Sequence, residues 1–504
     1  MSAHIVSLIR ALYAVGITGL ALYGVHNLIM VVLFLRERAK RARHPHVPLS
    51  PPKLWPHVTV QLPIFNEKFI IERLLSAVTK LEYPAGLLQI QVLDDSTDDT
   101  SSLTRTLVKQ YQKAGVNIEY LHRSDRSGFK AGALKAGLNS ASGELIAVFD
   151  ADFVPAPDWL YRTVPSFVDE QLGCLQTRWG HTNYDYDAFT RAISLGIDGH
   201  FVVEQSARSA NRLLMNFNGT AGIWRRACIS DAGGWQSDTL TEDLDLSYRA
   251  QLRGWRIAYL PEIVVPAELP ATVEAFKKQQ YRWAKGGMQS ARKLIPQVLG
   301  AKIPLHRKIL GIAHLSAHLV SPMVILSMIM ILPIGLLAPK DLTRYPWALV
   351  SAIGPLLVYF FSATEHAPRF IDRLRVFPLL LLIGFGLSVN NSLAVFEGLF
   401  GRGVGTFVRT PKFNLGNGGM ALKNSTYIPK VSKMVAVELL LAAYTVMSVS
   451  ILLPRLGIGI MPWLLAYAFG NIYIAVLNLM QTWYFARSPQ RPAVENGGWF
   501  NRLH

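Results

Sequence analysis

Cysteine is nearly absent from this 504-residue sequence, which has only Cys174 and Cys228. So few thiols exclude a disulfide-stabilised secreted scaffold and a thiolate metal cluster, because both need more cysteine. Charged residues are also sparse at 17%, and acidic residues are the rarer kind, 34 against 51 basic ones. In a soluble protein the formal net charge of +17 would favour nucleic acid as a partner.

Hydrophobic residues, by contrast, make up 50% of the chain and gather in long segments. Many basic residues flank these segments, as in the cytosolic loops of membrane proteins, so the expected partner is the lipid bilayer and not nucleic acid. The first segment, Ala11–Leu35, is too long for the apolar part of a signal peptide and leads into Arg36, Arg38, Lys40, Arg41 and Arg43. We expect a retained anchor whose carboxyl end lies in the cytosol.

Polarity divides the chain into three expected regions. Residues 1–50 form the anchor and a basic linker, residues 51–300 have the polarity of a soluble domain, and residues 301–504 are dominated by apolar stretches. In this last region four segments approach the length of about 20 residues that crosses a bilayer. They are Ile309–Leu337, Trp347–Ala363, Met434–Pro454 and Met461–Phe485.

One further apolar stretch, Val376–Phe400, is ambiguous. Basic residues lie on both sides of it, and it contains Asn390, Asn391 and Glu397. Charge on both flanks is typical of a helix in the cytosolic interface, whereas a crossing would place one flank outside. We predict an interfacial helix and hence five crossings, with the amino terminus outside and the carboxyl terminus inside. A sixth crossing is the alternative.

Short apolar runs alternate with helical patterns in the soluble region. The runs are Val58–Leu62, Ile90–Leu93, Ile118–Leu121 and Leu145–Phe149, and helix-like stretches such as Ile71–Lys80 and Ser101–Lys113 lie between them. This alternation predicts βαβ units and a mostly parallel sheet. Ligands bind beyond the carboxyl ends of such strands, and acidic residues follow several of these runs, namely Glu67, Asp95, Asp150 and Asp152.

Asp150-Ala151-Asp152 follows the strand Leu145–Phe149 directly. Two carboxylates at one strand end suit a divalent ion, and Mg²⁺ or Mn²⁺ prefers oxygen ligands and bridges phosphates. The alternative is a pair of solvated turn carboxylates. Asp95 stands in a second acidic run, in which Asp98 and Asp99 are expected to serve the start of the following helix. Lys130, set between glycines at a helix start, suits a phosphate or base contact.

Two later motifs offer groups for acid–base chemistry and sugar binding. Asp243 of Thr241-Glu242-Asp243 is a candidate general base that would take a proton from an attacking hydroxyl. The competing reading is an acidic helix start capped by Thr241. In Gln279-Gln280-Tyr281-Arg282-Trp283 an indole can stack on a sugar and an arginine can pair with a diphosphate, although Trp and Arg are also common at membrane interfaces.

Taken in order, these motifs resemble glycosyltransferase family 2, in its processive cellulose-synthase-like branch. The segments 61–67, 91–97, 149–153 and 217–225 are most similar to mannan and glucomannan synthases and to related β-glucan synthases. The resemblance implies an α/β GT-A (Rossmann-like) cytosolic domain over 51–300, inserted in an α-helical transmembrane domain. It also implies an inverting, processive transfer from a nucleotide sugar, GDP-mannose or UDP-glucose, onto a growing β-1,4-linked polysaccharide. The polysaccharide would then be translocated through the protein's own membrane segments.

The resemblance assigns roles residue by residue. Contacts to the nucleotide would come from Glu67, Asp95 and Lys130, and contacts to metal and diphosphate from Asp150 and Asp152, with Mg²⁺ or Mn²⁺ as cofactor. The base would be Asp243. The acceptor and diphosphate platform would include Asn218, Gly219, Thr220, Glu242, Gln279, Arg282 and Trp283. Within residues 401–415, Phe407, Thr410 and Lys412 are similar to a mobile loop that covers the donor.

Two other functions compete with this interpretation. Related membrane glycosyltransferases add a single sugar to a lipid such as ceramide or diacylglycerol, and they share the first three motifs. The Gln279-x-x-Arg282-Trp283 pattern and the several carboxyl-terminal crossings favour the polymer. A non-enzymatic membrane scaffold would leave the ordered carboxylates unexplained. The expected location is a bacterial inner membrane or a Golgi membrane, with the catalytic domain cytosolic in both cases.

Overall fold

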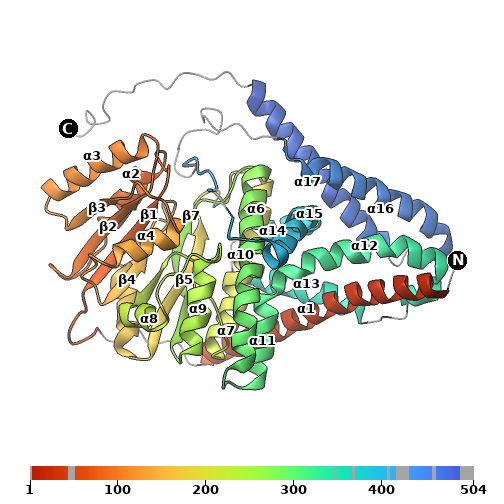
Figure 1. Cartoon of the computed structure of the whole chain (residues 1–504), viewed down its shortest axis with the longest axis horizontal. Coiled ribbons are helices and arrows are strands. Elements are labelled where there is room, and N and C mark those ends of the chain that lie inside the picture. The colour runs from red at the N-terminus through yellow and green to blue at the C-terminus, as the bar shows by residue number, and fades with distance from the viewer. Residues whose placement is uncertain are drawn as a thin grey trace.

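A computed structural model of the chain describes residues 3–43, 51–343, 345, 347–365, 369–405, 409–415, 431–456 and 461–487. An α/β domain and a bundle of long helices lie side by side (Figure 1). The strands are β1 Val58–Ile64, β2 Leu88–Asp94, β3 Ile118–His122, β4 Leu145–Val148, β5 Leu172–His181, β6 Gly222–Arg225 and β7 Arg256–Ala267. All four strands expected from the sequence are present.

The strands form one mixed sheet in the order β3-β2-β1-β4-β6-β5-β7. Strands β3, β2, β1 and β4 run parallel, and β6 is antiparallel to both of its neighbours. The parallel half carries the acidic residues at its carboxyl edge. The expectation of a mostly parallel sheet is therefore confirmed for this half, while β6 makes the whole sheet mixed.

Helices cover both faces of the sheet, which is why its central strand is apolar throughout. In β4, Leu145 and Ala147 join the core on one face and Ile146 and Val148 join the core on the other, because successive side chains point to opposite sides. The helices of the first core are α2 Ile71–Val78, α3 Thr100–Lys113 and α5 Trp159–Thr163, and those of the second are α4 Phe129–Gly137, α8 Arg226–Asp231 and α9 Glu242–Leu252.

Other helices join the α/β domain to the bundle. They are η1 Val164–Val168, α6 Ala188–Asp198, the π-helix η2 Gly199–Gln205, α7 Ser206–Ala210, α10 Val273–Gly300, α11 Leu305–Leu315 and η3 Ala317–Leu319. One apolar cluster is shared between the two parts: Ile193 of α6 and Phe276 of α10 pack with Ile383 and Ile474 of the bundle. The α/β domain therefore does not end at a polar boundary.

The bundle consists of α1 Ala3–Arg43, α12 Val320–Leu337, η4 Pro339–Thr343, α13 Ala348–Thr364, α14 Phe370–Gly386, α15 Ser388–Phe400, α16 Met434–Leu456 and α17 Met461–Arg487. Four helices of the described chain are long and apolar enough to cross a membrane, namely Ala3–Arg43, Ala317–Leu337, Met434–Pro454 and Met461–Phe485. The shorter apolar helix α13 has 17 residues.

The expected segment Ile309–Leu337 is not one helix, so that prediction needs correction. The chain leaves helical geometry at Ser316, which separates α11 from η3 and α12. The Ser316 carbonyl accepts a hydrogen bond from the Tyr23 hydroxyl of α1 at 2.7 Å. Only the part from Ala317 onward qualifies as a membrane span.

Contacts along α1 give the direction of the helices beside it. Arg10 pairs with Asp341 after α12 at 2.6 Å, and Arg38 pairs with Glu365 after α13 at 3.1 Å. Helix α12 therefore runs antiparallel to α1, and α13 returns parallel to it. The helices α1 and α13 approach closely at Gly24, where an added Cβ would lie 2.2 Å from the Val350 carbonyl oxygen, as small residues allow in membrane bundles.

The ambiguous stretch forms two helices, α14 and α15, which meet at an angle of 45°. Both ends of this pair contact the α/β domain or α10. Near its start Arg373 donates to Asp198 at 2.5 Å, and near its end Glu397 accepts from Lys285 at 2.9 Å. A pair whose two ends return to the same side is the arrangement expected of an interfacial or re-entrant segment.

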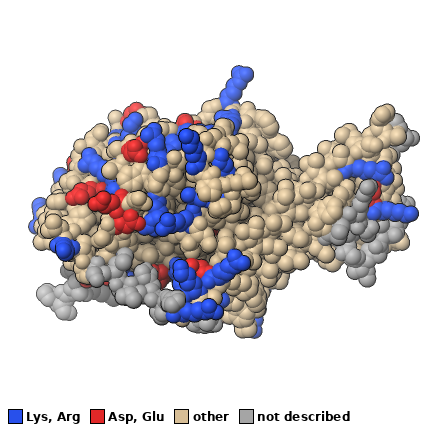
Figure 2. Space-filling model, turned by 90° about the horizontal axis from the view of Figure 1, so that it is seen from below, with Lys and Arg blue, Asp and Glu red and all other residues tan. Residues whose placement is uncertain are grey.

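Charge is unevenly distributed over the surface. On the face shown in Figure 2, Lys, Arg, Asp and Glu gather over one lobe, and the adjoining helical region is free of them up to its far end. A charge-free band next to a charged lobe is what a bilayer-embedded bundle requires.

A buried ion pair joins α10 to α16. The Lys277 ammonium lies 2.5 Å from Glu438, and these side chains are 3% and 0% exposed. Glu438→Ala would leave a buried ammonium without its partner, so we expect the free energy of unfolding in detergent to fall by about 3–5 kcal/mol. The matched control is Glu365→Ala, which removes a half-exposed pair with Arg38 and should cost about 1 kcal/mol or less. Equal losses in the two variants would contradict this prediction.

Candidate active site

A cleft opens at the carboxyl edge of the parallel strands. Of the residues predicted for the site, those that line it are Glu67, Asp95, Lys130, Asp150, Asp152, Asn218, Gly219, Glu242, Asp243, Gln279, Arg282, Trp283, Thr410 and Lys412. Thr220 does not line the cleft but supports it, since its hydroxyl accepts the Asp150 backbone N–H at 2.8 Å. Phe407 lies outside the described residues.

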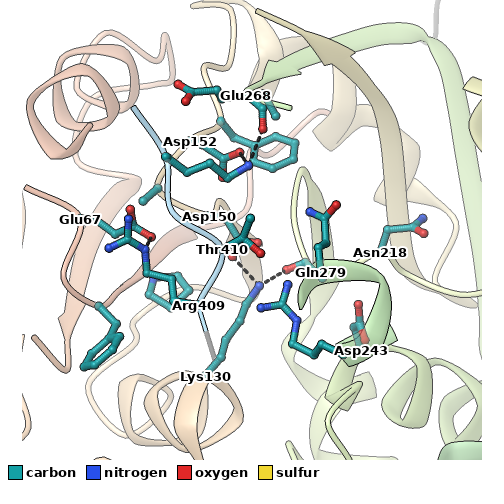
Figure 3. A pocket seen from close by; sticks show the side chains of 18 of the residues that line it. Glu67, Lys130, Asp150, Asp152, Asn218, Asp243, Glu268, Gln279, Arg409 and Thr410 are labelled. Carbon is teal, nitrogen blue, oxygen red and sulfur yellow. Dashed lines mark hydrogen bonds and ion pairs between the residues drawn. The ribbon is translucent and has the colours of Figure 1, made fainter. Parts of the chain in front are cut away.

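Asp150 and Lys130 face each other at the centre of the cleft (Figure 3). The Lys130 ammonium donates to the Asp150 carboxylate and, at 2.8 Å, to the Gly219 carbonyl oxygen. Burial alone would lower the pKa of Lys130, but Asp150 and Glu242 raise it above its ordinary value. Lys130 is therefore a fixed positive charge, held between a strand end and the loop before β6.

Asp152 and Glu67 each face a cation from the segment 409–415. Lys412 lies 2.7 Å from Asp152, and Arg409 lies 3.0 Å from Glu67. Burial raises the pKa of Glu67 to about 8, with a further contribution from Asp152, although Arg409 opposes the rise. Burial therefore outweighs the two loop cations, Arg409 and Lys412, and keeps the pKa of Glu67 above its ordinary value.

Glu268, which follows β7, holds this segment in place. Its buried carboxylate accepts the Phe413 backbone N–H at 2.6 Å, and its backbone oxygen accepts from Lys412. Arg73 donates to the Asn414 side chain at 2.7 Å. Glu268, Arg73 and Arg409 were not predicted from the sequence. The sequence shows that these three residues are charged, but no motif around any of them indicates that residues so far apart in the chain lie together.

Asp95 is held by an arginine that sequence reasoning also missed. Arg123 donates to both carboxylate oxygens of Asp95, at 2.8 and 2.6 Å. Beside this pair, the Arg126 guanidinium lies 3.4 Å from the ring centroid of Phe65. The cleft therefore ends in a flat cationic and aromatic surface next to a carboxylate, which suits a planar heterocyclic base.

Glu242 and Asp243 begin helix α9 on the opposite wall. Burial, with the neighbouring Asp243, raises the pKa of Glu242 to about 7. Burial also raises the pKa of Asp243, while Lys130 opposes this rise. The cap at Thr241 that the competing interpretation required is absent, because its side chain accepts no capping hydrogen bond and lies 3.0 Å from the Ser290 hydroxyl.

Gly219 fits between these groups because it has no side chain. It has φ +82, and an added Cβ would lie 2.9 Å from Asp243 Oδ2. Gly219→Ala should displace Asp243 or the loop that carries the Lys130 acceptor, and a misplacement on this scale lowers turnover by about 100-fold. The control is Gly234→Ala, which has φ +72 and no atom within 4 Å of the added Cβ. If both variants lost activity equally, backbone strain and not the clash would be the cause.

Helix α10 brings Gln279, Arg282 and Trp283 to the cleft. Burial lowers the pKa of Arg282, while Asp150 and Glu242 raise it. Trp283 lies beside Trp179 of β5, with ring centroids 6.5 Å apart. Two indoles near a buried guanidinium can bind both the apolar face of a sugar and an anionic group.

Asp150 and Asp152, which follow β4, fit a divalent cation because carboxylate oxygens are the ligands that Mg²⁺ and Mn²⁺ prefer. In the described residues no group of three or more acidic, His or Cys side chains could hold a metal by itself. Oxygens of a bound ligand would therefore have to complete the coordination, as Mg²⁺ and Mn²⁺ sites with phosphates do. Lys130 and Lys412 now pair with these aspartates and would be free to contact the ligand instead.

The cleft has two chemically different ends. Figure 3 shows Glu67 and Arg409 on one side, Asn218 and Asp243 on the other, and Lys130 with Asp150 between them. One end offers carboxylates and cations suited to a nucleoside diphosphate, and the other offers a candidate base. A hydroxyl that entered at the end with Asp243 would lie next to a ligand group bound between Lys130 and Asp150.

Comparison with known sequences gives matches over most of the chain. Residues 56–286 match a family described as Glycosyltransferase like family 2. Glucomannan 4-beta-mannosyltransferase 2 of Arabidopsis thaliana is 35% identical over 428 residues, which cover 81% of this chain and 78% of that protein. Glucomannan 4-beta-mannosyltransferase 1 of Oryza sativa subsp. japonica is 39% identical over 321 residues, which cover 60% of this chain and 62% of that protein. The match thus spans about three-fifths of the rice protein.

A solved structure shares the fold. A mannosyltransferase from Pyrobaculum calidifontis in complex with GDP-Man and Mn2+ matches with a TM-score of 0.53 and 20% identity, covering 78% of this chain and 99% of that chain. At this identity the likeness concerns the fold alone, and it agrees with the GT-A-like mixed sheet.

Proposed function

Because the chain belongs to glycosyltransferase family 2, together with the glucomannan 4-beta-mannosyltransferases, we propose that it transfers mannose from GDP-mannose onto a growing β-1,4-linked polysaccharide. The observation that carries this proposal is the cleft with its two different ends. Asp150 and Lys130 lie between the end suited to a nucleoside diphosphate and the end that contains Asp243. The names of the relatives and the GDP-Man of the structural neighbour support this donor. UDP-glucose remains the second donor to test.

The donor would lie across the cleft with its base near Asp95 and its diphosphate near Asp150. Glu67 and Lys130 would contact the nucleotide, and Arg282 would face the departing diphosphate. Asp150 and Asp152 would hold Mg²⁺ or Mn²⁺, which supplies positive charge to the leaving group when it is bound. Thr410 and Lys412 would cover the donor, which is supported by the position of Lys412 on Asp152.

Transfer would proceed in one displacement. Asp243 takes the proton from the acceptor hydroxyl as its oxygen attacks the anomeric carbon, and the bond from that carbon to the diphosphate oxygen breaks on the opposite face. The electron pair of that bond leaves with the nucleoside diphosphate, beside Lys130 and Arg282. A single displacement inverts the anomeric configuration, so an α-linked donor gives a β-linked product.

The acceptor would occupy the end of the cleft formed by Asn218, Glu242, Gln279 and Trp283, with Gly219 and Thr220 shaping the loop behind it. This end adjoins the helices of the bundle, since Trp283 lies on α10, which packs against α15 and α11. We propose that the polysaccharide is elongated processively at this end of the cleft and passes between the membrane helices. The closeness of this end of the cleft to the bundle helices supports processive elongation over release after each sugar.

The proposed topology has five crossings, made by α1, α12, α13, α16 and α17, with the α/β domain in the cytosol. It is supported by the antiparallel and parallel contacts of α1 with its neighbours. The basic carboxyl end of α1, with Lys40, Arg41 and Arg43, supports the cytosolic side. The bent pair α14–α15 would lie in the interface, because both of its ends contact the cytosolic part.

The test is an assay of purified, lipid-reconstituted protein with Mg²⁺ or Mn²⁺ and radiolabelled GDP-mannose or UDP-glucose, each offered alone. The product is separated into extractable lipid and insoluble polymer, and the polymer is digested with β-mannanase or cellulase. We expect polymer from GDP-mannose that β-mannanase degrades. Label found only in a single-sugar lipid, such as a glycosylated ceramide or diacylglycerol, would contradict the proposal.

The same assay gives a pH prediction. The base must be ionised to accept a proton, and burial raises the pKa of Asp243 above its ordinary value. A raised pKa keeps the carboxyl protonated over a higher pH range, so the acid limb of kcat/KM is expected above the range of an exposed aspartate. A value of kcat/KM that stayed constant down to about pH 4, where an ordinary aspartate titrates, would contradict the assignment of Asp243 as the base.

A further inference from the structure

The π-helix η2 places a histidine and a glutamate four residues apart behind the cleft. His200 Nδ1 lies 2.9 Å from Glu204 Oε2, and His200 Nε2 lies 2.9 Å from Asn218 Oδ1. π-Helical turns are rare and occur often at functional sites. Asn218 is the cleft-lining residue at the end opposite Glu67 (Figure 3), whereas neither His200 nor Glu204 lines the cleft.

Glu204 is ionised and fixed from the other side. Burial by itself would raise its pKa, but Arg208 and His200 hold the pKa of Glu204 well below its usual range. The second carboxylate oxygen accepts from Arg208 Nε at 2.8 Å, and the Arg208 side chain is fully buried. The ionised carboxylate accepts a hydrogen bond from Nδ1–H of His200, and this bond orients the ring so that Nε2 faces Asn218.

The loop that His200 reaches carries several contacts to the reacting groups. The Asn218 backbone N–H donates to the Gln176 side chain at 2.8 Å. The Gly219 carbonyl oxygen accepts a hydrogen bond from Lys130, and Asp243 lies against Gly219. The Asn218 side chain also accepts from Asn216 at 2.9 Å. His200 links the Asn218 side chain to the π-helix behind the loop, and Gln205 of the same helix donates to the Asn216 carbonyl at 3.0 Å.

The same network reaches the first long helix. Arg208 donates to the Leu214 carbonyl at 2.9 Å, at the start of the loop, and lies 2.9 Å from His26 of α1. The end of the cleft that holds Asn218 is thus linked to helix α1 through one continuous set of polar contacts, made by His200, Glu204, Arg208 and His26.

We propose that His200, oriented by Glu204, is a positioning residue that fixes Asn218 and so aligns the acceptor hydroxyl with Asp243. This inference rests on the proposed transfer function. If the acceptor sugar is misaligned while GDP-mannose is bound normally, water can attack the mannose of the donor in place of the acceptor hydroxyl. The effect to measure is therefore the ratio of nucleoside diphosphate released to mannose incorporated into polymer, together with donor affinity.

The experiment compares His200→Ala, His200→Gln and Asn218→Ala in the reconstituted full-length protein with GDP-mannose. In His200→Ala we expect the ratio to rise by up to about 100-fold, which is the effect of misplacing a reactant by 1 Å, with unchanged affinity for GDP-mannose. His200→Gln provides a side-chain amide N–H that can donate to Asn218 Oδ1, so it should restore a ratio near wild type. Because His200 acts through Asn218, the double variant His200→Ala/Asn218→Ala should be no worse than Asn218→Ala alone.

The matched control is His122→Ala. His122 also lies beside a carboxylate, 3.3 Å from Asp94, and is 34% exposed compared with 28% for His200, but it does not line the cleft. Its ratio should not change. Equal loss of donor binding and transfer in His200→Ala, or additive effects with Asn218→Ala, would overturn the inference alone. Wild-type protein that released no nucleotide from either donor would overturn the proposed function, and this inference with it.

Discussion

Replacing Asp243 by Asn is expected to abolish sugar transfer while GDP-mannose binding stays close to wild type. The amide keeps the size of the carboxylate and can still accept the Leu244 backbone N–H, which lies 2.8 Å from Asp243 Oδ1. What it loses is the ability to take a proton from the acceptor. General base catalysis contributes about 10²- to 10⁴-fold, so kcat should fall by that factor. Turnover and the donor dissociation constant are the two quantities to measure.

A second aspartate provides the comparison for Asp243→Asn. Asp238 is 56% exposed, pairs with Lys293 and does not line the cleft, so Asp238→Asn should leave both quantities unchanged. If Asp243→Asn retained near-normal turnover, Asp243 would not be the base, and the neighbouring Glu242 would become the candidate. If it lost donor binding as strongly as turnover, its role would be in the fold of the site.

Asp152→Ala is expected to remove metal-dependent donor binding. Even residues that contact a metal only indirectly contribute about 10- to 100-fold to its affinity, so a direct ligand should contribute at least as much. The measurement is a titration of Mn²⁺ at fixed GDP-mannose, read as donor binding in wild type, Asp150→Ala and Asp152→Ala. Unchanged metal dependence in both variants would contradict the metal role of this pair.

Lys412→Ala separates the metal role of Asp152 from its ion pair. Lys412 lies 2.7 Å from Asp152, so Asp152→Ala also frees this lysine. If Asp152 acts as a metal ligand, Lys412→Ala should weaken donor binding but keep its dependence on Mn²⁺. If Lys412→Ala lost the dependence on Mn²⁺ as completely as Asp152→Ala, the loss would be caused by displacement of the segment 409–415 and not by removal of a metal ligand.

The sequence was sufficient to predict the parallel half of the sheet and the residues at its edge. Leu145–Val148 is apolar at every position because both faces of β4 are covered, and such a run can be read without a structure. The acids that follow β1, β2 and β4 then meet at one edge by topology alone. The strands β5, β6 and β7 were not predicted; β6 has four residues, and β7 contains prolines and is paired with a register shift.

The partners of the site residues could not be predicted, because they come from distant parts of the chain. Glu268 meets Phe413, and Glu67 meets Arg409, and no local pattern records either contact. The break at Ser316 is similar, since Tyr23 of another helix binds it. Helical periodicity in one segment contains no information about a hydrogen bond from a helix nearly 300 residues away.

The apolar cluster shared by α6, α10, α14 and α17 affects how this enzyme can be handled. Residues 51–300 resemble a soluble domain in composition, yet Ile193 and Phe276 are covered by Ile383 and Ile474 from the bundle. A fragment cut at residue 300 would present this surface to water, and exposed apolar patches of this kind lead to aggregation. We therefore expect the α/β part to need the helical bundle to remain soluble, and studies of its kinetics to need the full-length chain in detergent or lipid from the first purification step.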